Sequence, residues 1–128
     1  MVVTLATGGL LGLLFFWLSW RVVQVRLSAQ VLLGDGGDAE LLSRIRAHAN
    51  FAEYVPFCLL LLLAIEASFQ DSPKALWAAG MALVAARAAH AIGMAKGGTN
   101  AFRAGGALAT WGIMIALSVW ALVIAVRY

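Results

Sequence analysis

Four long apolar stretches follow one another along the chain, and short polar or glycine-rich segments separate them. They cover about residues 2–33, 39–68, 73–95 and 100–126. A helix needs about 20 mostly apolar residues to cross the hydrocarbon core of a bilayer, and each stretch is long enough. The pattern therefore predicts an all-α protein, an integral membrane four-helix bundle that forms a single domain over residues 1–128. Because the connections are short, consecutive helices are expected to be antiparallel neighbours.

The connecting segments contain signals that start and stop helices. The segment GDGGD at 34–38 breaks the chain, and its Asp38 is a candidate N-cap for the second helix. Pro73 stands at the expected start of the third helix, where proline is tolerated. The segment KGGTN at 96–100 ends that helix and offers Thr99 or Asn100 as the cap of the fourth. Each predicted boundary thus has a local chemical reason.

Two pairs of glycines have the GxxxG spacing that permits close packing of membrane helices. We expect close packing at Gly8 and Gly12, whereas Gly93 and Gly97 lie near a helix end and are interpreted as termination signals. Glu66, near the second connection, is interpreted as part of a solvated helix end. The tryptophans fall mostly near the predicted membrane interfaces and are interpreted as anchors there, at Trp17, Trp20, Trp77, Trp111 and Trp120.

Composition supports a membrane protein. The 128 residues are 63% hydrophobic and 12% charged, with a mean hydropathy of +0.92. Soluble domains average about 45–50% apolar and about 25% charged residues. The basic residues form no run, which argues against a nucleic-acid partner. The single cysteine, Cys58, has no partner for an intrachain disulfide, and the absence of a Cys/His cluster argues against a metal site.

Basic residues concentrate around the first and third connections, at Arg21, Arg26, Arg44, Arg46, Arg87, Lys96 and Arg103. The second connection and the C-terminus contribute only Lys74 and Arg127. By the positive-inside rule, both termini are expected on the non-cytoplasmic side. The polar groups at the start of the second helix then lie at the cytoplasmic end.

The stretch RAHANFAEYVPF at 46–57 combines polar groups with an apolar helix. Its spacings place Arg46, Asn50, Glu53 and Tyr54 on one helix face. A guanidinium suits a carboxylate, a glutamate suits an ammonium, and an amide both donates and accepts. The row therefore favours a zwitterionic ligand with several carboxylates and an amine. A structural network remains the alternative, with Arg46 paired to Glu53 and Asn50 bridging them.

Two further polar sites face the same end. Arg87, His90 and Met94 share a face of the third helix, and Arg103 lies in the first turn of the fourth. A lone histidine such as His90 or His48 is more often a packed, hydrogen-bonded residue than a catalyst. Polar groups at only one end do not form a conduction path, so a transporter or channel is the least favoured function.

The stretch RAHANFAEYVP resembles the signature of the MAPEG family, the membrane-associated proteins in eicosanoid and glutathione metabolism. The matching positions are Arg46, Ala47, His48, Asn50, Glu53, Tyr54 and Pro56. The chain length, the four-helix layout and the expected position of the termini are also similar. The likeness in layout covers essentially the whole chain, while the matching residues are concentrated in this stretch of 11 residues.

The resemblance implies a homotrimer that binds glutathione, as co-substrate, between neighbouring subunits at the cytoplasmic end. By this resemblance, glutathione contacts Arg46, Asn50, Glu53 and Tyr54. Arg103 matches the family arginine beside the sulfur, where it favours the nucleophilic thiolate. Further contacts are implied for Arg26, near the end of the first helix, and for His90.

The third helix departs from the better-known eukaryotic members, because His90 and Met94 stand where those members have tyrosines. Specialised leukotriene or prostaglandin synthesis is therefore not implied. The chain resembles a short bacterial-type member in the inner membrane. The function implied is a glutathione-dependent transferase or peroxidase that acts on lipophilic electrophiles. The alternative is a non-catalytic structural or accessory membrane subunit, in which the polar row serves assembly.

Overall fold

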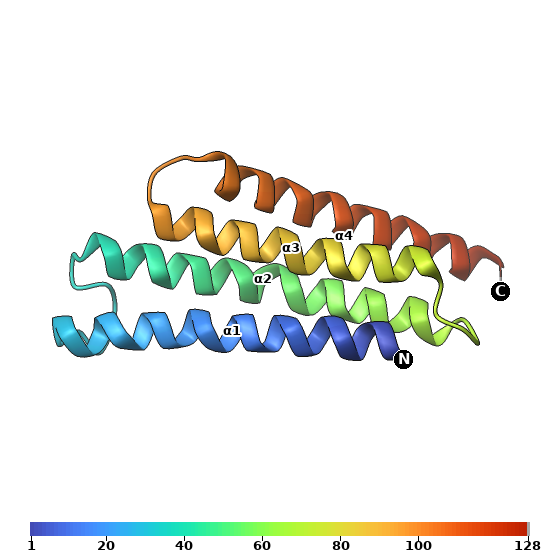
Figure 1. Ribbon diagram of the computed structural model, residues 1–128, viewed down its shortest axis with the longest axis horizontal. Helices are drawn as coiled ribbons and strands as arrows, with labels where there is room; N and C mark the ends of the chain where they lie inside the picture. Colours follow the sequence, from blue (N-terminus) through green and yellow to red (C-terminus); the bar gives the residue numbers. More distant parts are fainter. Residues whose placement is uncertain (128) are drawn as a thin grey trace.

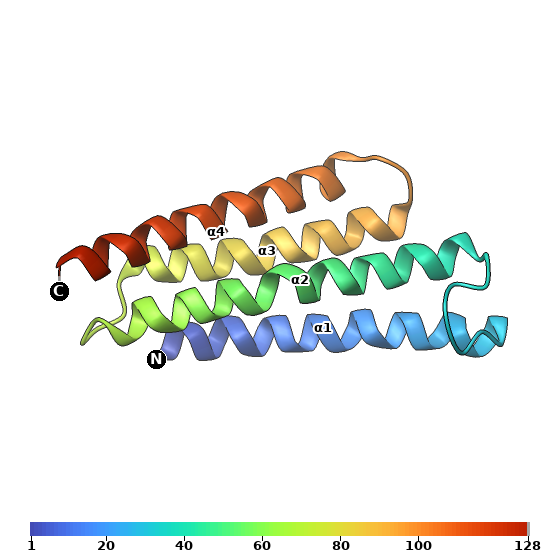
Figure 2. The same ribbon diagram turned by 180° about the vertical axis from the view of Figure 1, so that it is seen from behind.

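The computed structural model describes residues 1–127, which form four antiparallel helices (Figure 1). These are α1 (Val2–Ala29), α2 (Ala39–Ala67), α3 (Lys74–Lys96) and α4 (Ala101–Arg127). All four are long and apolar enough to cross a membrane, which confirms the predicted four-helix architecture. The α1–α2 and α3–α4 connections lie at one end of the bundle, opposite the chain termini, as the reverse view also shows (Figure 2). We call this the basic end because it carries Arg21, Arg44, Arg46, Lys96 and Arg103.

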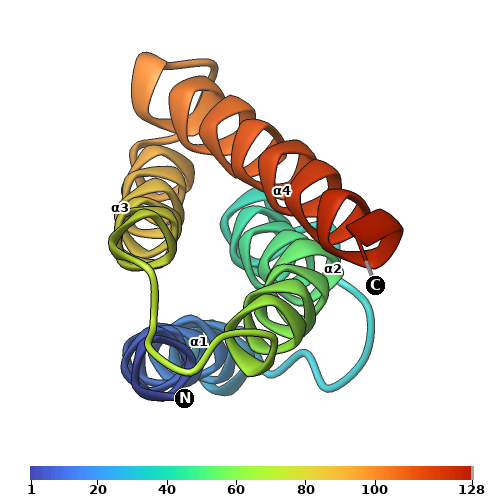
Figure 3. The same cartoon turned by 90° about the vertical axis from the view of Figure 1, so that its right-hand side faces the viewer.

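Viewed along its axis, the bundle places α1 and α4 on opposite sides, with α2 and α3 between them (Figure 3). The main helix pairs are α1 with α2 and α3 with α4. The buried apolar cluster includes Leu18, Phe51, Leu62, Leu83 and Leu117. Large apolar side chains also cover the outside, as expected of helices solvated by lipid.

The helix boundaries follow the predicted caps closely. The carboxylate of Asp38 accepts a hydrogen bond from the Leu41 amide at 2.9 Å, and Asn100 caps α4 by accepting one from the Arg103 amide at 3.0 Å. The first helix ends at Ala29, earlier than the predicted residue 33. Gln30 adopts a left-handed conformation with φ 53°, and its amide donates to the carbonyl of Arg26. This left-handed residue ends the helix before the apolar run is finished.

Of the glycines with GxxxG spacing, Gly93 has the close contact, whereas the first pair, where we expected it, has none. A Cβ at Gly12 would meet open space, and one at Gly8 would only touch Leu59, so this pair does not bring two helices together within the subunit. A Cβ at Gly93 would collide with the backbone of Arg103, and one at Gly106 would lie 2.5 Å from the Ala86 carbonyl oxygen. The interpretation of Gly93 as a termination signal is therefore wrong. It permits close packing of α3 on α4, whereas Gly97 does end α3.

Glu66 is buried rather than solvated, so the interpretation of its position as a solvated helix end is also wrong. Its carboxylate accepts hydrogen bonds from the backbone amides of Val3 and Thr4, both at 2.8 Å, and from the Ser72 hydroxyl at 2.5 Å. The first amides of a helix have no partner inside the helix, and a negative charge there is favourable. Glu66 therefore caps α1 and ties it to the end of α2.

Replacing Glu66 with alanine is expected to destabilise the bundle by about 2–3 kcal/mol, because two helix amides lose a charged acceptor in a buried position. The measurement is the thermal unfolding midpoint in detergent. Asp71→Asn, an exposed change in the adjoining connection, is the control and should leave the midpoint nearly unchanged. Equal midpoints for the two variants would show that Glu66 does not cap α1.

Candidate functional site

A pocket of about 550 Å³ lies at the basic end, between the start of α2, the end of α3 and the start of α4. Its volume is in the range of small-molecule sites, about 300–1,000 Å³. The pocket is lined by Ala39, Glu40, Leu42, Ser43, Arg46, Met94, Ala95, Lys96, Gly97, Gly98 and Arg103. The fold thus brings together Arg46 and Arg103, two of the residues that the sequence singled out.

Positive charge dominates this pocket, because three cations line it and Glu40 is its acidic residue. Arg46 lies 3.8 Å from the Glu53 carboxylate, and both side chains are about half exposed. Arg103 donates one hydrogen bond, at 3.3 Å, to the carbonyl of Gly98. Each guanidinium carries five N–H donors, so both retain donors for an anionic ligand. Carboxylates suit such planar donors because they accept two parallel hydrogen bonds.

Asn100 fixes the position of Arg103. Its side-chain amide donates to the carbonyls of Gly93 at 2.8 Å and Gly97 at 3.2 Å, while its oxygen accepts from the Arg103 amide. This residue therefore closes the α3–α4 connection from both sides. Together with the close packing at Gly93, it holds the first turn of α4 against the end of α3. Arg103 consequently projects from a rigid helix start.

Asn50 contacts α3 rather than its neighbours in the α2 row. Its side-chain oxygen accepts a hydrogen bond from Arg87 at 2.9 Å, so it does not bridge Arg46 and Glu53 as the structural alternative proposed. Arg87 is 2% exposed, and its other polar contacts are Thr110 and His90, both at 3.5 Å. These partners carry no negative charge. Because the Asn50 oxygen is occupied, its NH₂ group is the part that remains to meet a ligand.

Arg46 and Arg103 are the predicted site residues that line the pocket; Asn50, Glu53, Tyr54, His90 and Arg26 do not line it. Tyr54 packs against Trp111, with ring centroids 6.3 Å apart, and His90 is buried beside Arg87. Arg26 donates to the carbonyls of three connection residues, Val31, Leu32 and Gly34. It also lines a separate hollow of about 300 Å³ together with His48. The subunit therefore distributes the predicted site residues over several separate places and does not gather them in one pocket.

Lys96 also lines the pocket, although no motif in the sequence predicts a site there. It is the last residue of α3, and its ammonium lies 4.4 Å from the centre of the Phe102 ring. In the sequence, Lys96 is one of the basic residues that concentrate around the first and third connections. Its position directly before the glycines of the α3–α4 connection is the signal that could have identified it, since Arg103 follows shortly after that connection.

Known proteins resemble this chain over most of its length. The sequence model of the MAPEG family matches residues 4–123. The inner membrane protein YecN of Escherichia coli K12 is 33% identical over 114 residues, which cover 84% of this chain and 83% of that protein. YecN of the O6:H1 strain matches to the same extent. The family model and the relatives both cover most of the chain. The four membrane helices and the polar row of α2 fit the same family. The chain belongs to the MAPEG family.

Proposed function

We propose that the protein is a membrane-bound, glutathione-dependent transferase or peroxidase that acts on lipophilic electrophiles. The observation that carries this proposal is the pocket at the basic end, in which Arg46, Lys96 and Arg103 meet. Glutathione has two carboxylates, one ammonium and one thiol. Arg46 and Lys96 suit the carboxylates, and the NH₂ group of Asn50 donates to a further acceptor. Glu53, beside Arg46, suits the ammonium.

The proposed role of Arg103 is to stabilise the thiolate of glutathione. The thiol proton passes to water, and the sulfur lone pair forms a bond to the electrophilic carbon of the substrate. The displaced group leaves with the bonding electrons. In the peroxidase reaction the thiolate attacks a peroxide oxygen and the O–O bond breaks. The products are a sulfenic acid and an alkoxide, which takes a proton from water and becomes an alcohol. A second glutathione then reduces the sulfenic acid and forms glutathione disulfide and water.

A homotrimer is part of this proposal, because it gives Arg26 a role. The hollow lined by Arg26 and His48 shares no residue with the pocket of Arg46 and Arg103. Within one subunit the two are separate, so Arg26 can serve a pocket only if that pocket belongs to a neighbouring subunit. Tyr54, which packs on Trp111, and the buried His90 then support the helices around the pocket and do not contact the ligand directly. The proposed location is the inner membrane, with both termini non-cytoplasmic and the pocket at the cytoplasmic end.

A non-catalytic structural or accessory subunit is the second candidate. The observation in its favour is that the Asn50 oxygen already bonds Arg87, and that Arg46 lies near Glu53, as an assembly network requires. In this case the α2 row stabilises the bundle and binds no thiol.

Turnover distinguishes the two candidates. Purified protein in lipid vesicles is incubated with glutathione and a panel of lipophilic alkyl halides, enals and organic hydroperoxides, and glutathione loss is measured above the uncatalysed rate. The proposal expects saturable loss with at least one class. Arg127→Ala, at the opposite end of the bundle, should retain this activity. A folded protein inactive with every class would favour the structural candidate.

A further inference from the structure

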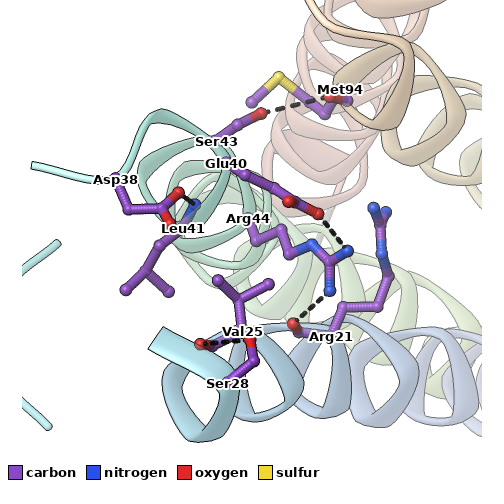
Figure 4. A network of polar contacts seen from close by, with 9 residues as sticks. All are labelled: Arg21, Val25, Ser28, Asp38, Glu40, Leu41, Ser43, Arg44 and Met94. Atoms are coloured by element: carbon purple, nitrogen blue, oxygen red, sulfur yellow. Dashed lines mark hydrogen bonds and ion pairs between the residues drawn. The ribbon is translucent and has the colours of Figure 1, made fainter. Parts of the chain in front are cut away.

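A second polar cavity, of about 140 Å³, lies at the basic end between α1, α2 and α3. It is lined by Arg21, Glu40, Ser43, Arg44, Ala47, Met94 and Ala95. Figure 4 shows five of them, Arg21, Glu40, Ser43, Arg44 and Met94. The Ser43 hydroxyl donates to the Met94 carbonyl at 3.2 Å. The cavity and the larger pocket share Glu40, Ser43, Met94 and Ala95. Neither Arg46 nor Arg103 lines the smaller cavity, so its two arginines, Arg21 and Arg44, are not those of the larger pocket.

The guanidinium of Arg44 is held in place by its neighbours. It donates to the Arg21 carbonyl at 2.7 Å and to the Glu40 carboxylate at 2.5 Å, so it links α1 to α2 (Figure 4). The Nε of Arg44 is buried and has no hydrogen-bond partner among residues 1–127. This arrangement leaves one guanidinium donor directed at no protein acceptor.

Arg21 completes the cavity and brings a second positive charge. Its guanidinium lies 4.9 Å from the centre of the Trp17 ring, and no polar group of the described chain accepts a hydrogen bond from it. Two arginines and one glutamate line the cavity, which therefore carries a net charge of +1. Within residues 1–127, Glu40 is paired to Arg44, and Arg21 forms no salt bridge of its own.

The length of α1 places this cavity at the level of the lipid headgroups. A hydrocarbon core of about 30 Å corresponds to about 20 residues at 1.5 Å per residue, so a span that begins near Val2 ends near Arg21. Trp17 and Trp20 lie at the same level, where amphipathic rings favour the membrane interface. Basic pockets between membrane helices at this depth bind acidic lipid headgroups.

We propose that the cavity between Arg21 and Arg44 binds the phosphate group of an anionic phospholipid. Phosphate oxygens accept paired hydrogen bonds from guanidinium groups, and the net positive charge favours a lipid with a net negative charge over a zwitterionic one. At about 30 Å³ per water, the cavity has room for only a few waters, which suits a phosphate group and not a tripeptide. This site does not depend on the proposed glutathione chemistry.

The test uses the purified full chain in an uncharged detergent, titrated with short-chain phosphatidylglycerol, with phosphatidylcholine of the same chain length, or with inorganic phosphate. Binding is followed by the fluorescence of the tryptophans and by the thermal unfolding midpoint. Phosphatidylglycerol should bind saturably and raise the midpoint. Arg21→Gln should weaken that binding roughly fivefold or more, as expected for one basic group at the membrane surface. Arg127→Gln removes the same charge at the opposite end and should leave the affinity unchanged.

Arg21→Gln is expected to fold, because the Arg21 guanidinium makes no hydrogen bond that the bundle requires. Equal affinity of the wild type and Arg21→Gln for phosphatidylglycerol would overturn the proposal. Equal affinity for phosphatidylcholine and phosphatidylglycerol would overturn the role of net charge. Binding of inorganic phosphate alone would assign the cavity to a soluble phosphate. Displacement of the lipid by glutathione would show that the two ligands compete for one site, and this result would also overturn the proposal of a separate lipid site.

Discussion

Arg103→Ala is expected to lower kcat for glutathione-dependent turnover by about 10²–10³-fold, the range seen when one preorganised donor to a developing negative charge is removed. The reason is that the reactive species is the thiolate, and Arg103 is the cation that the proposal places beside it. Because the affinity for glutathione rests mainly on its carboxylates and ammonium, the dissociation constant should change much less than kcat. Steady-state kinetics and the ultraviolet absorbance of the bound thiolate measure the two effects.

Lys96→Ala is the matched comparison for Arg103→Ala, since both residues line the same pocket and both changes remove one positive charge. Lys96→Ala should weaken glutathione binding with little change in the thiolate absorbance. If Arg103→Ala instead weakens binding and leaves kcat and the thiolate signal intact, Arg103 holds a carboxylate and its proposed role is wrong.

Asn50→Leu is expected to destabilise the bundle by about 3–5 kcal/mol, because it leaves the buried charge of Arg87 without its closest acceptor. The thermal unfolding midpoint should fall by roughly 10 °C or more. The remaining polar contacts of Arg87, with Thr110 and His90, are both at 3.5 Å and do not replace the lost bond.

Asn50→Asp separates stability from binding at the same position. An aspartate keeps the acceptor for Arg87 and adds the opposite charge, so the midpoint should stay at or above that of the wild type. The same change replaces the NH₂ donor with an acceptor, and glutathione binding should weaken about tenfold. An Asn50→Asp variant that binds glutathione as well as the wild type would show that the amide does not contact the ligand. A low midpoint for this variant would contradict the pairing with Arg87.

Much of the fold could be predicted from the sequence because its signals are local. The apolar runs identified all four membrane helices, and the side chains of Asp38 and Asn100 cap helices as predicted. The position where α1 ends was missed, since the apolar run continues past Gln30 and only the left-handed backbone of that residue stops the helix. Local patterns therefore gave the order of the helices and most of their ends.

The missed features depend on how the helices are rotated against one another. Asn50 and Arg87 lie 37 positions apart, and Glu66 caps a helix that begins more than 60 positions earlier. The spacing of residues along one helix shows which of them share a face, but it does not show which residues of another helix they contact. The choice between the two glycine pairs was wrong within the subunit for the same reason, because the packing of α3 on α4 at Gly93 depends on the backbone of Arg103 opposite it. The roles of Arg46, Glu53, Tyr54, Arg26 and His90 toward a ligand stay predictions.

Isothermal titration calorimetry with glutathione tests whether the pocket at the basic end binds it. The purified protein is titrated in detergent, and Arg46→Ala is the paired variant. Arg46 is exposed, and its charged contact is the 3.8 Å approach to Glu53, so the variant should remain folded. We expect saturable binding to the wild type that weakens at least tenfold in Arg46→Ala, because a charge-assisted contact to a carboxylate is lost. Absence of heat with a folded wild type, or equal affinity of the two proteins, would contradict the assignment of this pocket to glutathione.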